Sequence, residues 1–232
     1  MKIQPFEELV AAKFRLIKPY FTNTRKRDTS VIDTIVLHWT AGASLSSDIK
    51  TLKQKNYGYH FLIDKSGRVY QGSPLNKVIS HSGSSYGPNG KYVNGHSIGI
   101  SFSMKGTEGA SEFTNEMYNS CSELILNIKR SLPNLKYITG HHWVSPGRKI
   151  DPYTFDFLRL MNVLGSGFKL WKTGYSPFPD GLTDCKCIKK DTKGNCTKSS
   201  GRCKGVGNYG YSERNLSTEV SSLSFQSDLD TE

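Results

Sequence analysis

Two segments are almost continuously apolar and rich in β-branched residues, and they constrain the fold more than any other feature. They are VIDTIVLHWT (31–40) and SIGISFSM (97–104). Runs of this length are typical of strands buried on both faces of a sheet, which requires cover on both sides. Helical patterns at 44–55, 112–131 and 153–165 can supply such cover. We therefore expect an α/β domain with a single mixed, mostly buried β-sheet flanked by helices.

The expected elements divide the chain into three parts. Further strand patterns occur at 58–64, 68–72 and 136–140. Every strand pattern falls within residues 30–165, which we predict to be the main domain. Residues 1–29 are expected to be an N-terminal helical extension and linker, because apolar residues recur there at helical spacing up to Ile17. Residues 166–232 are expected to be a Cys-, Lys- and Gly-rich appendage with a polar tail.

Charge and hydropathy exclude some classes of protein. The chain has 232 residues and a net charge of +11, and no apolar run approaches the ~18 residues of a membrane-spanning helix. Acidic residues at Glu7 and Glu8 argue against a secretory signal peptide. The positive charge favours a polyanionic partner. It is spread along the chain rather than gathered in a basic arm, so nucleic acid is not the expected partner.

Four of the five cysteines lie close together in the predicted appendage. Their spacing fits none of the common zinc modules, although four thiolates can hold a structural zinc. Two disulfides are the alternative outside a reducing compartment, and free thiols are the third. These residues are Cys185, Cys187, Cys196 and Cys203.

Histidines are placed where an α/β fold presents ligand groups. His38 ends the first buried run, and His141 follows the strand pattern KYITG. Asp151 comes ten residues after His141, across the turn at 146–148. Two imidazoles and one carboxylate leave a fourth position open, as in a catalytic zinc site. Spacing alone makes this a weak indication, because sets of this kind are common.

Four blocks of sequence carry a stronger signal when they are read in order. They are IDTIVLHWTAG, GYHFLIDKSGRVYQG, HSIGISF and ITGHHWVSPGRKIDP. Together they resemble the signature blocks of the zinc-dependent N-acetylmuramoyl-L-alanine amidases, a superfamily that includes phage lysozyme-amidases and peptidoglycan recognition proteins. The resemblance covers about 32–157. It implies cleavage of the amide between N-acetylmuramic acid and L-alanine.

The resemblance assigns the metal ligands residue by residue. The family's first zinc histidine corresponds to His38, its second to His141 and its third ligand to Asp151, which precedes Pro152. His142 is a competing neighbour. Because consecutive strand residues face opposite sides, only one of the pair should reach the metal, and the preceding glycine favours His141.

Two catalytic residues also follow from the resemblance. Tyr59 matches the tyrosine that phage-type members place over the zinc-bound water, and Lys149 matches the lysine that stabilises the oxyanion. The recycling branch of the family has a glutamate where this chain has Ser101. That departure places the chain with the tyrosine-using members.

Three polar residues are the predicted substrate contacts. His81 resembles the histidine that lines the muropeptide groove, and Asn94 lies where the family has polar groove residues. His60 is the third predicted contact; its alternatives are to support the metal site without touching the substrate, or to point into the core.

The expected function is that of a zinc hydrolase of bacterial peptidoglycan, working as a monomer. The implied setting is a phage endolysin or a virion-associated lysin, present in the host cytoplasm and then in the periplasm and cell wall on lysis, or in the virion. The alternative is a non-catalytic peptidoglycan-binding module of the same fold. The presence of all three ligand positions favours the enzyme.

Overall fold

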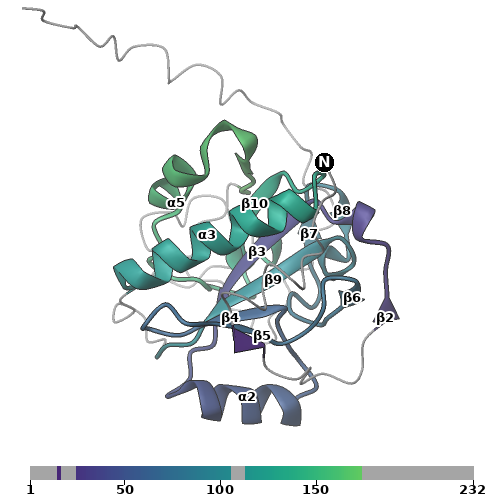
Figure 1. The fold of residues 1–232 in the computed structure, drawn as a ribbon. Helices are drawn as coiled ribbons and strands as arrows, with labels where there is room; N and C mark the ends of the chain where they lie inside the picture. The colour runs from purple at the N-terminus through teal and green to yellow at the C-terminus, as the bar shows by residue number, and fades with distance from the viewer. Residues whose placement is uncertain (1–14, 17–24, 106–112, 174–232) are drawn as a thin grey trace, which may run out of the picture. The chain divides into compact units, whose positions relative to one another are not determined.

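The structure is a computed structural model that describes residues 15–16, 25–105 and 113–173. Its centre is a seven-stranded sheet in the order β1-β5-β4-β9-β3-β10-β11 (Figure 1). Neighbouring strands are parallel except β4 and β5, which form an antiparallel hairpin. The expected mixed α/β sheet is confirmed. The strands are β1 (Arg15–Leu16), β3 (Thr34–Trp39), β4 (Phe61–Ile63), β5 (Val69–Gln71), β9 (Ser97–Phe102), β10 (Tyr137–Gly140) and β11 (Lys169–Leu170).

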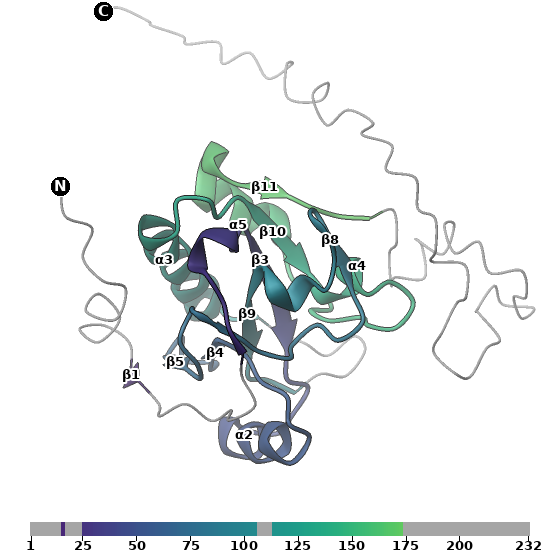
Figure 2. The same ribbon diagram turned by 90° about the vertical axis from the view of Figure 1, so that its right-hand side faces the viewer.

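Helices and two small sheets surround this centre (Figure 2). The small sheets pair β2 (Arg25–Lys26) with β6 (Lys77–Val78), and β7 (Tyr86–Gly87) with β8 (Gly90–Lys91). The α-helices are α2 (Leu45–Gln54), α3 (Asn115–Ser131), α4 (His141–Val144) and α5 (Phe157–Leu164). The 3-10 turns are η1 (Thr29–Val31), η2 (Val93–Gly95) and η3 (Gly165–Gly167).

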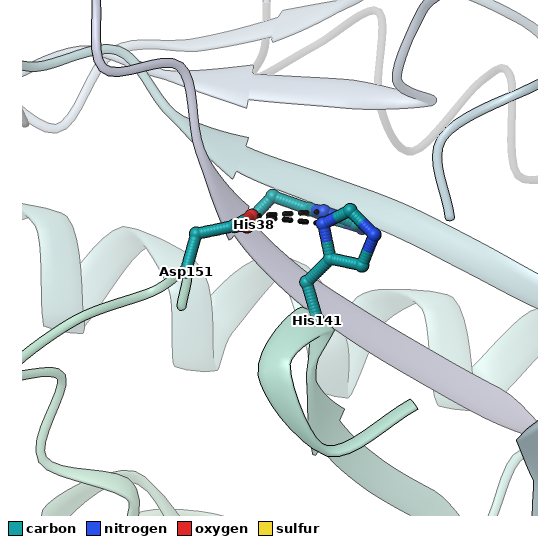
Figure 3. Close-up of side chains that lie close together, drawn as sticks. All are labelled: His38, His141 and Asp151. Carbon is teal, nitrogen blue, oxygen red and sulfur yellow. Dashed lines mark hydrogen bonds and ion pairs between the residues drawn. The ribbon is translucent and has the colours of Figure 1, made fainter. Parts of the chain in front are cut away.

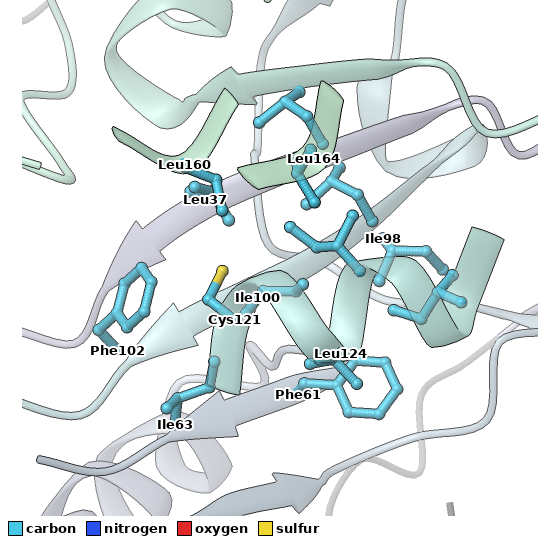
Figure 4. Close-up of a cluster of buried hydrophobic side chains, with 14 of the residues drawn as sticks. Leu37, Phe61, Ile63, Ile98, Ile100, Phe102, Cys121, Leu124, Leu160 and Leu164 are labelled. Carbon is cyan, nitrogen blue, oxygen red and sulfur yellow. The ribbon is translucent and has the colours of Figure 1, made fainter. Parts of the chain in front are cut away.

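The two faces of the sheet differ in chemistry, because side chains alternate along each strand. On β3, Ile35 and Leu37 join the main apolar core with α3 and α5 (Figure 4). The alternate residues Val36 and His38 point the other way. In the parallel register, His38 is paired with Ser101 of β9. One face of the sheet is therefore an apolar core, while the other presents polar side chains beside His38.

Helix α3 shows how the sequence sets the core. Its start is fixed by Thr114, whose hydroxyl accepts the N–H of Met117 at 3.2 Å. Residues at helical spacing then face the sheet, and Leu124 is fully buried, whereas Leu126 is 36% exposed.

We predict that Leu124→Ala destabilises the protein by about 2–5 kcal/mol, because it leaves a cavity in the core. The matched change Leu126→Ala, on the same helix, should cost no more than about 1 kcal/mol. Urea unfolding of both variants measures this difference. Equal losses would mean that α3 does not pack as described.

The fold extends beyond both predicted domain limits. At the C-terminal end, β11 pairs with β10, and Phe168 is buried in the core. At the N-terminal end, Arg27 lies within the fold, and its guanidinium donates to the carbonyls of Asn94, Gly95 and Ser97. The chain at 15–16 forms the short strand β1 rather than the end of a helix, because it pairs with β5. The rest of the predicted N-terminal helix lies outside the described residues.

No helix within the described ranges has the length and hydropathy needed to cross a membrane.

Candidate metal centre

Three side chains converge on the polar side of the sheet (Figure 3). His38 lies near the end of β3, His141 begins α4, and Asp151 lies in the loop that follows. Asp151 Oδ2 is 3.3 Å from His38 Nδ1 and 3.1 Å from His141 Nδ1. One ligand atom from each residue lies within 4.8 Å of the others, and all three side chains are buried. The structure thus brings the predicted ligands together.

The spacing of these atoms fits a small tetrahedral cation. Zinc bonds of ~2.0–2.1 Å at tetrahedral angles place two ligand atoms ~3.3–3.4 Å apart. The two distances to Asp151 Oδ2 are close to that value. His38 Nδ1 is also a buried nitrogen without a well-formed hydrogen bond among the described residues. A nitrogen left in this way is suited to a metal, since a buried polar atom needs a partner.

The electrostatics also suit metal binding. Burial, followed by the neighbouring His141, lowers the pKa of His38 to about 4, so its imidazole is neutral at pH 7. Burial alone would raise the pKa of Asp151, but the two imidazoles beside it hold this pKa well below its usual value. A neutral imidazole and an ionised carboxylate are the forms that bind a metal.

His142 faces away from the three ligands. Its Nδ1 lies 3.1 Å from the carbonyl oxygen of Asp151, and its ring packs against Trp143 and Phe157. Both His141 and His142 belong to the first turn of α4 rather than to a strand. As expected, the two side chains point in different directions. The reason is that successive residues of a helix point about 100° apart.

Tyr59 lies beside His38, one of the three ligands. Its ring centroid is 4.9 Å from that of His38. Burial raises the pKa of Tyr59, and the charge of Asp151 adds to this effect, so its hydroxyl keeps its proton at neutral pH. Tyr59 also lines a cavity of about 330 Å³ beside helix α2. Of the residues discussed at the site, Tyr59 lines this cavity and the three ligands do not.

Lys149 lies two residues before Asp151 and is partly exposed. Its positive charge lowers the pKa of His38, with a smaller effect than burial and His141, whereas Asp151 raises this pKa. The neighbouring Arg148 turns toward the loop at 82–84, where it donates to the carbonyl oxygens of Ser82 and Ser84.

His60 is fully buried beneath β9. Its Nδ1 accepts the N–H of Gly99 at 3.0 Å, and its Nε2 lies 3.0 Å from the carbonyl oxygen of Lys77. Burial, followed by the charge of Arg27, lowers the pKa of His60 to about 3. Because the backbone occupies both ring nitrogens, we reassign His60 from substrate contact to the support of β9.

His81 and Asn94 lie next to the centre, with their polar atoms directed inward. His81 is 7% exposed, and its Nδ1 is 3.1 Å from His38 Nε2. Asn94 Oδ1 accepts the backbone N–H groups of His81 and Ser82. Substrate contact by these two residues stays a prediction.

Two polar groups near the site were not predicted from the sequence. Asp48 is 4% exposed, lines the cavity beside Tyr59 and accepts the hydroxyl of Ser103 at 2.6 Å. The carbonyl of Ser82 lies 3.1 Å from His141 Nε2. The position of a backbone carbonyl cannot be predicted from residue types. In the sequence, Asp48 resembles any acidic residue in the first turn of a helix. The four clustered cysteines lie outside the described residues.

Comparison with known families gives one match over more than half of the chain. Residues 28–154 match the family described as N-acetylmuramoyl-L-alanine amidase. A curated relative, the 1,6-anhydro-N-acetylmuramyl-L-alanine amidase AmpD of Haemophilus influenzae, is 35% identical over 114 residues, which are 47% of this chain and 59% of the relative. The chain therefore covers less than two thirds of that relative's length.

Solved structures share the fold. A selenomethionine derivative of AmpD superposes with a TM-score of 0.55 and 22% identity, covering 66% of this chain and 96% of that one. The amidase AmiD from E. coli, solved with anhydro-N-acetylmuramic acid-L-Ala-D-gamma-Glu-L-Lys, gives 0.51 and 23%, covering 60% and 61%. At these identities the likeness is evidence for the fold alone.

Proposed function

The chain belongs to the N-acetylmuramoyl-L-alanine amidase family, and from this premise we propose that it is a zinc hydrolase of peptidoglycan. The bond cleaved is the amide between the lactyl group of N-acetylmuramic acid and the L-alanine of the stem peptide. The observation that carries the proposal is the buried set His38, His141 and Asp151, in which the two distances to Asp151 Oδ2 match the ligand spacing of a tetrahedral zinc site.

The residues around this set have separate tasks in the proposed reaction. When bound, zinc supplies a Lewis acid and a water that is acidic near neutral pH. Tyr59 lies over His38 and keeps its proton, so its hydroxyl can orient the attacking water. Lys149, partly exposed at the edge of the site, stabilises the negative charge that develops on the amide oxygen. The cavity beside Tyr59 leaves room for part of the substrate.

The main rival is a binding module of the same fold that holds muropeptides without cutting them. Digestion of purified peptidoglycan by the full chain, followed by mass spectrometry, separates the two. We expect free stem peptides that begin with L-alanine, and their loss when a chelator is added. Bound but uncut peptidoglycan would favour the binding module, and cut sugars or cut cross-links would contradict the bond assignment.

We also propose that the physiological substrate is intact cell wall, as for a phage endolysin or virion-associated lysin. The net charge of +11 supports this setting, because it suits an anionic polymer. The named activity of the Haemophilus influenzae relative favours small anhydro-muropeptides instead. Comparing hydrolysis rates on insoluble sacculi and on soluble anhydro-muropeptides distinguishes the two. A strong preference for the soluble substrate would refute the lysin proposal.

A further inference from the structure

We infer that the two-residue segment His81–Ser82, held by Asn94, orients both histidines of the metal site. The inference rests on the proposed zinc site and adds positioning residues to it. His81 and Ser82 follow β6 in a loop, and they reach His38 and His141 from the side away from Asp151. Neither is a ligand in this arrangement, since they contact the opposite nitrogen of each ring.

The contact between His81 and His38 favours one proton position on the His38 ring. Ser97 Oγ donates to the carbonyl of Val93 at 2.5 Å, so it can only accept from His81 Nε2, which lies 3.2 Å away. A neutral His81 therefore has its proton on Nε2 and a lone pair on Nδ1. That lone pair lies 3.1 Å from His38 Nε2 and 2.9 Å from Ser82 Oγ, so either group can donate to it. When His38 Nε2 donates, His38 Nδ1 has no proton and faces Asp151.

The contact with His141 acts in the same direction. His141 Nε2 lies 3.1 Å from the carbonyl oxygen of Ser82, which can only accept. On the other side of the ring, His141 Nδ1 lies within hydrogen-bond distance of Asp151 Oδ2, at 3.1 Å. A proton on Nε2, donated to Ser82, leaves the Nδ1 lone pair for a metal. By accepting from the Nε2 atoms of His38 and His141, the segment favours the ring states in which both Nδ1 atoms can bind a metal beside Asp151.

The segment itself is held in place from two sides. Asn94 Oδ1 accepts the N–H of His81 at 3.2 Å and that of Ser82 at 2.8 Å. On the other side, a side chain at position 99 would collide with the His81 ring, since a Cβ there would lie 2.7 Å from its Cγ. Gly99 thus leaves the space that the ring occupies.

The first test compares two changes of His81 in the full-length protein. His81→Ala removes the acceptor for His38, and loss of such an outer partner typically weakens metal binding by ~10–100-fold. His81→Asn restores an acceptor, because its amide oxygen is as far along the side chain as Nδ1. We expect zinc affinity, measured by competition with a chelator, to fall for alanine and to return largely to the wild-type value for asparagine. Thermal unfolding of the metal-free variants checks that both fold.

A second test displaces the ring without removing a polar atom. Gly99→Ala should weaken zinc binding by pushing His81 away from His38. Gly95→Ala is the matched control, because a Cβ there meets nothing within 4 Å. The inference is overturned if His81→Ala binds zinc as tightly as the wild type, or if His81→Asn is as weak as His81→Ala. If the wild-type protein binds zinc tightly but leaves peptidoglycan intact, the proposed function fails while this inference is still tested by affinity.

Discussion

Replacing Asp151 with alanine should remove one equivalent of bound zinc from the full-length protein and reduce peptidoglycan hydrolysis to background. Its Oδ2 lies within 3.3 Å of the Nδ1 atoms of both His38 and His141, so it is the residue that joins the ligand set. His38→Ala and His141→Ala should have the same effect, because each leaves two protein ligands of three. Metal analysis of the dialysed protein, compared with the wild type, measures the loss.

His142→Ala is the matched control for this experiment. The residue is as buried as His141 and adjacent to it, but its Nδ1 faces the carbonyl oxygen of Asp151 rather than the ligand set. We expect this variant to keep its zinc, although it removes a buried ring. If His142→Ala loses the metal and His141→Ala keeps it, the ligand assignment is wrong. If neither affects zinc, the centre described above does not bind the metal.

The longer strands of the central sheet could be predicted from the sequence because the residue pattern that indicates a strand lies within the strand itself. β3 and β9 are rich in apolar and β-branched residues, and both are buried throughout. The ends of the fold were harder to place. β11 has only the two residues Lys169–Leu170, and its existence depends on pairing with β10 rather than on its own pattern. A strand this short has no periodicity to detect.

The three metal ligands could be predicted from the sequence for a similar reason. His38 and His141 belong to motifs whose order along the chain is informative, and Asp151 follows at a fixed spacing. The contacts of His60 and Asn94 could not be predicted from the sequence in this way. They depend on hydrogen bonds to backbone groups 39 and 12 to 13 residues away in the chain, which are set by the packing of loops onto β9. Polar residues beside a motif can therefore be identified as important without revealing what they contact.

Lys149→Ala and Tyr59→Phe should leave zinc bound while slowing hydrolysis, which separates catalytic groups from ligands. Neither residue belongs to the ligand set, so metal content should stay at the wild-type level. Loss of Lys149 removes a positive charge beside the developing oxyanion. Removal of one such donor typically costs ~2.7–4 kcal/mol of transition-state stabilisation, or about 10²–10³ in rate.

Tyr59→Phe tests the hydroxyl alone, because the ring and its 4.9 Å centroid distance to His38 can be kept. If the hydroxyl orients the attacking water, kcat should fall while KM changes little, since the interaction is needed in the transition state more than in substrate binding. Steady-state rates on a soluble muropeptide, measured at equal zinc content, give both constants. A fall in zinc content would instead show that Tyr59 supports the metal site, and an unchanged kcat would remove it from the mechanism, leaving Lys149 as the nearby group that acts on the substrate.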